Sequence, residues 1–148
     1  MNKIYLDNNS STKTDPEVLD SMIPYFIEKY GNPSSNSHSF GWEAKAAIDL
    51  AKDQISKLIN AKSNEIIFTS GATESINLSI KGLITDNINN QIITSSIEHK
   101  ATLDACKNVK RSNIIYISPN KKGLINVDKI KKSISNQTLL ISIMHANN

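Results

Sequence analysis

Small and hydroxyl-bearing residues follow a short apolar run in segment 65–75, E-I-I-F-T-S-G-A-T-E-S. The pattern predicts a strand over 66–69, a tight turn at Gly71 and a helix beginning near Thr73. Glycine permits backbone angles and close approach that a larger residue would block, and the free N–H groups of a helix start can donate to an anion. The hydroxyls of Ser70 and Thr73 add donors. The segment therefore predicts a phosphate-binding turn, although many α/β proteins have such a junction without a ligand.

Two further polar clusters follow apolar runs. Residues 92–95 lead into S-I-E-H-K, which contains His99, and residues 139–144 lead into H-A-N-N, which ends in Asn148. The carboxyl ends of parallel strands lie along one edge of a sheet, so these clusters and the turn are expected to converge. A phosphate site, an imidazole and a carboxamide together suit a flat, phosphorylated aromatic cofactor. Pyridoxal 5'-phosphate meets that description.

An alternation of helices and strands must position these groups. Before the alternation we expect a helix over 16–29 that Pro24 interrupts, an irregular loop over 31–37, and a long helix whose apolar positions run from Ala44 to Ile59. The later strands are expected at 66–69, 92–95, 114–117 and 139–144, and the helices at 73–83, 101–110 and 127–133. Apolar strands joined by helices predict an α/β fold, a partial three-layer αβα arrangement around a mostly parallel sheet.

Composition excludes several classes of protein. The chain has 148 residues, 39% of them hydrophobic, and a net charge of +3 with Arg111 as its one arginine, so no basic and aromatic surface for nucleic acid is expected. Cys106 is the one cysteine, which excludes an intramolecular disulfide and a cysteine-based zinc site, and we expect no metal. With neither a signal peptide nor a membrane-spanning run in the sequence, we expect a soluble cytoplasmic protein.

Several motifs carry a family resemblance. They are D-N-N-S-S-T (7–12), G-N-P-S-S (31–35), S-H-S-F-G (37–41), F-T-S-G-A-T-E-S (68–75), E-H-K-A (98–101) and S-I-M-H-A-N-N (142–148). In order and spacing they resemble the class V aminotransferase superfamily, and more narrowly the cysteine desulfurases that supply sulfur for iron–sulfur clusters. The chain departs from the family pattern at residues 10–12, where Ser-Ser-Thr stands in place of Ala-Thr-Thr. The resemblance implies the large domain of a fold-type I pyridoxal-phosphate enzyme.

The resemblance also implies roles for particular residues. Ala72 and Thr73 match the positions that bind the cofactor phosphate, His99 matches the imidazole stacked on the pyridine ring, and Asn148 matches an asparagine that contacts cofactor or substrate. The family places its Schiff-base lysine, its nucleophilic cysteine and two further functional residues beyond position 148. We therefore expect no catalytic residue within this chain and no turnover by the chain alone. Residues 1–14 are expected to form an extended segment and 15–148 an incomplete cofactor-binding domain.

Two residues offer competing interpretations. Cys106 shares a helical spacing with Leu103 and Val109, which favours a buried small apolar side chain over a sulfur acceptor. Lys100 follows His99 at an expected helix start, where its amine is expected to meet solvent.

The function implied is conversion of L-cysteine to L-alanine, with sulfur passed as an enzyme persulfide to an iron–sulfur scaffold or another acceptor protein, by a homodimer. A selenocysteine lyase or another class V enzyme is an alternative. So is a non-catalytic module that pairs with a second chain.

Overall fold

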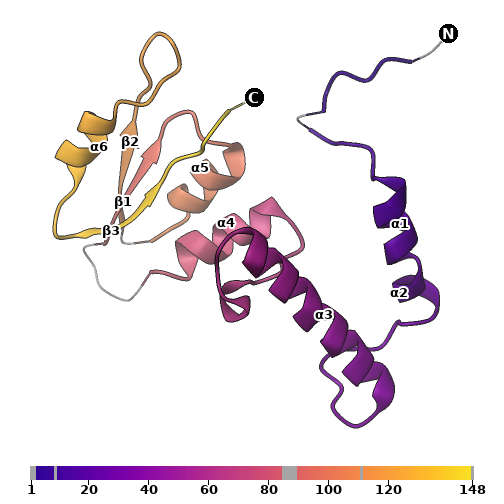
Figure 1. Ribbon diagram of the computed structural model, residues 1–148. Helices are drawn as coiled ribbons and strands as arrows, with labels where there is room; N and C mark the ends of the chain where they lie inside the picture. Colours follow the sequence, from indigo (N-terminus) through magenta and orange to yellow (C-terminus); the bar gives the residue numbers. More distant parts are fainter. Residues whose placement is uncertain (1–2, 9, 85–89, 111, 148) are drawn as a thin grey trace. The chain divides into compact units, whose positions relative to one another are not determined.

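The computed structural model describes residues 3–8, 10–84, 90–110 and 112–147. These form two compact units, Met1–Phe68 and Thr69–Asn148, hereafter unit 1 and unit 2 (Figure 1).

Unit 1 is helical in its described residues. Its elements are α1 (Pro16–Met22), α2 (Pro24–Ile27), α3 (Ser39–Leu58) and the short 3-10 helix η1 (Ser63–Glu65). The predicted interruption at Pro24 is confirmed, because α1 ends before it and α2 begins with it. Residues 31–37 form the predicted irregular loop, and the imidazole Nδ1 of His38 accepts a hydrogen bond from the Gly41 N–H as the N-cap of α3 (3.3 Å).

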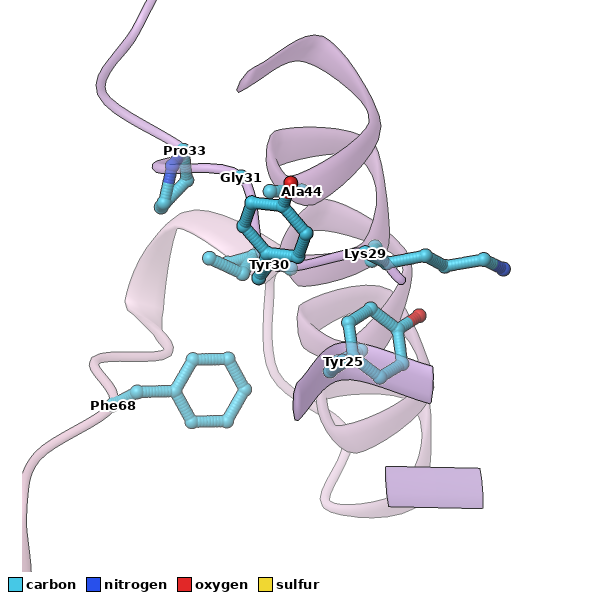
Figure 2. Close-up of a pocket in the computed structure, with 10 residues that line it drawn as sticks. Tyr25, Lys29, Tyr30, Gly31, Pro33, Ala44 and Phe68 are labelled. Atoms are coloured by element: carbon cyan, nitrogen blue, oxygen red, sulfur yellow. The ribbon is translucent and has the colours of Figure 1, made fainter. Parts of the chain in front are cut away.

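An apolar groove of about 450 Å³ lies within unit 1. Figure 2 shows Phe68 facing Tyr25 and Tyr30 across this groove, while the Lys29 amine points away from it. Part of the G-N-P-S-S motif contributes to the wall through Gly31 and Pro33. Ala72, Thr73 and His99 do not line this groove.

Unit 2 contains the parallel sheet. Its elements are α4 (Ala72–Lys81), β1 (Asn90–Ser95), α5 (Lys100–Lys107), β2 (Ser112–Ile117), α6 (Val127–Ser133) and β3 (Thr138–Ser142). The strand order is β2-β1-β3, and both neighbours of β1 run parallel to it. Since β1–α5–β2 and β2–α6–β3 cross the sheet in opposite directions, right-handed connections place α5 and α6 on opposite faces, as Figure 1 shows. The predicted α/β class with a parallel sheet is confirmed.

The core of unit 2 lies between the sheet and the helices α4 and α5. Ile92 pairs with Ile114 and with Leu140 in register, so these side chains share one face of the sheet. Ile80 of α4 and Cys106 of α5 pack in the same cluster. Cys106 is 1% exposed, which confirms the prediction that it is buried. Burial raises the pKa of its thiol above the ordinary value, and the Glu98 carboxylate raises it further.

One predicted strand is wrong. Residues 66–69 are extended but form no strand within the described parts of the chain. The apolar side chains of Ile67 and Phe68 are exposed rather than packed on the sheet. An apolar run becomes a strand only when a neighbouring strand pairs with its backbone, and none of the described strands does so here. The turn and the helix that follow the run are present as predicted.

Candidate functional site

The turn before α4 has the backbone that the sequence predicts. Gly71 is the N-cap of α4 with φ +157° and ψ −178°, a conformation that residues with a side chain rarely adopt. A Cβ placed on Gly71 would meet nothing within 4 Å, so the space beside this turn is open. No side chain among the described residues caps the start of α4. Its first N–H groups are therefore free of side-chain competition for an anion.

Ser70 is engaged differently from the prediction. Its backbone N–H and its hydroxyl both donate to Oε2 of Glu74, each over 2.6 Å. These two hydrogen bonds hold the pKa of the Glu74 carboxyl below its ordinary value. The expectation that the Ser70 hydroxyl faces a phosphate is therefore not met in this structure, because a carboxylate of the chain itself accepts from it. Thr73 remains exposed in the first turn of α4.

His99 begins helix α5. It is the N-cap residue, and its Nδ1 accepts a hydrogen bond from the Ala101 N–H over 3.2 Å. A neutral imidazole that accepts at Nδ1 carries its proton at Nε2, so the bond selects the tautomer and restricts the orientation of the ring. The side chain is exposed, which leaves the ring available to a planar ligand.

One cavity brings two of the predicted residues together. Thr73 and His99 both line a space of about 400 Å³ between α4 and α5. Its other polar lining residues are Asn77, Lys100, Asp104 and Asn108. Ala72 is exposed at the first position of α4 but does not line this cavity. Lys100 also lines this cavity and is exposed, in agreement with the expectation that its amine meets solvent.

The segment that follows β3 lines a second cavity instead. This space of about 520 Å³ is bordered by Ser95, His145 and Asn147. The Asn147 amide donates from Nδ2 to the Ile97 carbonyl over 2.7 Å, which holds the segment after β3 against the loop that leads to His99. The predicted cofactor contact of Asn148 lies outside the described residues. The polar residues that were expected to meet at one edge of the sheet thus line two cavities. Residues of segment 95–99 border both of them.

Glu98 is a residue whose role the sequence reasoning missed. It is 8% exposed, and its Oε1 accepts from the Ser95 hydroxyl and from the Met144 N–H, each over 2.8 Å. One carboxylate oxygen thus joins the loop between β1 and α5 to the segment after β3. An acidic residue three positions after the end of an apolar strand was the available signal, since a buried carboxylate needs hydrogen-bond donors from its surroundings.

The residues present fit a phosphorylated ring. An uncapped helix start, an open turn at Gly71 and the Thr73 hydroxyl suit a phosphate, while the imidazole of His99 is oriented and exposed for the ring. Glu74 reduces the donor set by occupying Ser70. The described residues contain no group of three or more His, Cys, Asp or Glu side chains placed to hold a metal ion. Within the same residues, no helix has the length and apolar character needed to cross a membrane.

Comparisons with known proteins identify the family of this chain. The family model described as aminotransferase class-V matches residues 4–148. The mitosomal cysteine desulfurase of Trachipleistophora hominis is 48% identical, over 99% of this chain and 34% of that protein. Cysteine desulfurase IscS of Rickettsia massiliae is also 48% identical, over 98% of this chain and 36% of that protein. The chain therefore spans about a third of the length of these relatives.

Solved structures share the fold. A NifS-like protein superposes with a TM-score of 0.85 at 36% identity, over 95% of this chain and 39% of that one. The X-ray structure of a NifS-like protein from Rickettsia africae gives a TM-score of 0.82 at 34% identity, over 97% of this chain and 40% of that one. These likenesses confirm the resemblance inferred from the motifs and the fold type that it implies.

Proposed function

We propose that this chain, which belongs to the aminotransferase class-V family, forms the cofactor-holding part of a pyridoxal-phosphate-dependent cysteine desulfurase. The observation that carries the proposal is the cavity shared by Thr73 and His99, beside an uncapped helix start at Gly71. The relatives named cysteine desulfurase support the choice of reaction.

The residues of this chain have distinct parts in the proposed site. The N–H groups at the start of α4 and the Thr73 hydroxyl bind the phosphate, and the helix dipole favours its negative charge. His99 orients the pyridine ring by stacking, with its own orientation restricted by the Ala101 N–H. Ala72 and Asn148 complete the proposed contacts. When bound, pyridoxal phosphate supplies an electron sink that stabilises negative charge developing at the α-carbon of an amino acid.

The overall reaction balances as a sulfur transfer. L-Cysteine and an enzyme thiol give L-alanine and an enzyme persulfide, so the carbon–sulfur bond of the substrate breaks and a sulfur–sulfur bond forms. The persulfide then passes its sulfur to a scaffold for iron–sulfur clusters or to another acceptor protein. We place this reaction in a homodimer in the cytoplasm, although one relative is named as mitosomal.

Cofactor binding is the first test. Equilibrium dialysis of the chain against pyridoxal 5'-phosphate should show binding, and Thr73→Val should weaken it by about ten-fold through loss of a charge-assisted hydrogen bond. The matched control is Thr12→Val, which removes an exposed threonine hydroxyl in unit 1 and should leave the affinity unchanged. No binding by the unaltered chain, or equal effects of the two variants, would contradict the proposed site.

His99 allows its two roles to be separated. Asparagine is a good N-cap but has no ring, so His99→Asn should retain α5 and still weaken cofactor binding. His99→Ala removes the cap as well and should also loosen the start of α5. Amide exchange at Ala101 reports the cap, and dialysis reports the ring. If His99→Asn bound the cofactor as tightly as the unaltered chain, the stacking role would be wrong.

The reaction is tested in the whole protein that contains this chain. With pyridoxal phosphate and L-cysteine, we expect alanine and protein-bound persulfide to form in equal amounts in a single turnover. Release of alanine from selenocysteine but not from cysteine would overturn the proposed substrate.

A further inference from the structure

The Glu98 carboxylate lies where the ends of two neighbouring strands meet. It is nearly buried, in the loop between β1 and α5, and Ser95 at the end of β1 donates its hydroxyl to Oε1. The Met144 N–H donates to the same oxygen from the segment that follows β3. One oxygen atom therefore bridges segments that lie 46 residues apart in sequence.

The two hydrogen bonds to the Glu98 carboxylate are of a strong kind. Hydrogen bonds to an ionised carboxylate are roughly twice as strong as those between neutral groups, and partial burial reduces competition from water. Met144 lies beyond β3, which ends at Ser142, so its N–H bonds to a side chain rather than within the strand. Without Glu98, the Met144 N–H and the Ser95 hydroxyl would each need another partner.

Two more hydrogen bonds join the same segments. The Thr94 hydroxyl donates to the Ser142 carbonyl over 2.8 Å, and the Asn147 amide donates to the Ile97 carbonyl over 2.7 Å. Segment 142–147 is therefore held to segment 94–98 at its start, its middle and its end. Glu98 forms the middle contact, and the next residue in the chain is His99.

We propose that Glu98 is a positioning residue that fixes segment 144–147 relative to His99. It acts through the Met144 N–H and does not itself contact the cofactor. The proposal rests on the proposed function in so far as the fixed geometry serves pyridoxal phosphate. Neighbouring contacts make a specific control possible, because Thr94 joins the same two strands without touching Glu98.

The test compares Glu98→Ala, Glu98→Gln and the control Thr94→Val by amide hydrogen exchange. Loss of the carboxylate should speed exchange at Met144 by about ten-fold, the effect of losing one charge-assisted hydrogen bond. Glutamine keeps an acceptor oxygen without the charge, so Glu98→Gln should give an intermediate rate. Thr94→Val should leave Met144 within about two-fold of the unaltered chain, since its bond is elsewhere. Exchange in β1, at Ile92 and Ile93, should stay the same in the Glu98 variants.

Two exchange results would overturn the proposal. One is an unchanged Met144 rate in Glu98→Ala. The other is an equal rise at Met144, Ile92 and Ile93, which would mean that Glu98 stabilises unit 2 as a whole. Should Glu98→Ala fail to fold, Glu98→Gln gives the same comparison with a smaller expected change.

Dialysis against pyridoxal 5'-phosphate separates this proposal from the function on which it rests. Glu98→Ala should weaken binding by about five-fold while Thr94→Val does not, if the fixed segment contributes to the site. Locally faster exchange with unchanged cofactor affinity would overturn the positioning role. Absence of binding by the unaltered chain would instead defeat the proposed function, and the Met144 exchange rate alone would then decide whether Glu98 fixes the segment.

Discussion

Glu74 places a carboxylate beside the point where a phosphate is expected. It accepts two hydrogen bonds from Ser70, and these lower the pKa of its carboxyl from the ordinary value of 4.5. The sequence of segment 68–75 predicted the turn but not this contact. A glutamate in the first turn of a helix can equally be a solvated residue that interacts favourably with the helix dipole. Only the folded turn brings the Ser70 donors to it.

A pH dependence follows from the lowered pKa. A carboxyl whose folded pKa lies below its unfolded value stabilises the folded turn fully above the unfolded value, and that contribution is lost as pH falls through the folded pKa. We therefore expect the Ser70 contacts to be intact above about pH 4.5 and to be lost at lower pH. The Ser70 amide chemical shift, followed by NMR as pH is lowered, reports this change.

The control for this titration is Glu74→Gln, which cannot ionise. In that variant the Ser70 shift should show no transition below pH 4.5. A transition of the same size in both proteins would mean that another group causes it. The effect on total stability is expected to be small, because Glu74 is exposed to solvent and its charge is screened.

Helices and strands could be predicted from the sequence where the apolar pattern of a segment matches the partners that the segment has in the fold. Helix α6 lies at its predicted position, Val127–Ser133, and β1, β2 and β3 each lie within about two residues of their expected ends. Residues 66–69 had the same apolar character, yet they form no strand because pairing is a property of the surrounding chain. The joint cavity of Thr73 and His99 followed from the order of elements. The Glu98 bridge did not, since an acidic residue after a strand does not indicate which segment, here 46 residues away, donates to it.

Gly71 permits a prediction at the start of α4. Its backbone lies at φ +157° with open space around the position of a Cβ, so the cost of Gly71→Ala comes from backbone strain and not from a clash. We expect a loss of about 1–3 kcal/mol of stability, measured by urea unfolding of the whole protein that contains this chain. Pyridoxal-phosphate binding should weaken too, because relief of the strain would redirect the first N–H groups of the helix.

Gly123 provides the matched control. It also has a positive φ, +80°, and open space around its Cβ position, but it lies in the loop between β2 and α6. Gly123→Ala should lower stability by roughly 1 kcal/mol through the same kind of strain. It should weaken cofactor binding less than Gly71→Ala does, because Gly123 lines the cavity after β3 and not the one shared by Thr73 and His99. Equal losses of affinity in both variants would show that the effect of Gly71→Ala is one of general destabilisation.

At the scale of the whole molecule, large apolar side chains are unusually exposed. In unit 1 Leu58 is 86% exposed and Phe26 is 72% exposed, and in unit 2 Ile141 of β3 is 40% exposed. Single exposed apolar residues are common on protein surfaces, but many large ones together favour association or binding to another surface. The chain is therefore expected to be a poor monomer on its own, even though unit 2 contains a packed core.

We predict that the isolated 148-residue chain associates reversibly or aggregates, binds an apolar dye, and unfolds without a single cooperative transition. Sedimentation velocity over a range of protein concentrations measures the association, and dye fluorescence measures the exposed apolar surface.

Leu58→Asp should reduce association, because it adds a charge at one of the most exposed apolar positions without removing a buried side chain. Ile92→Asp is the contrasting variant, since Ile92 is fully buried and its replacement should disrupt unit 2 and increase dye binding. A monomer that unfolds cooperatively at low protein concentration and binds no dye would contradict the prediction.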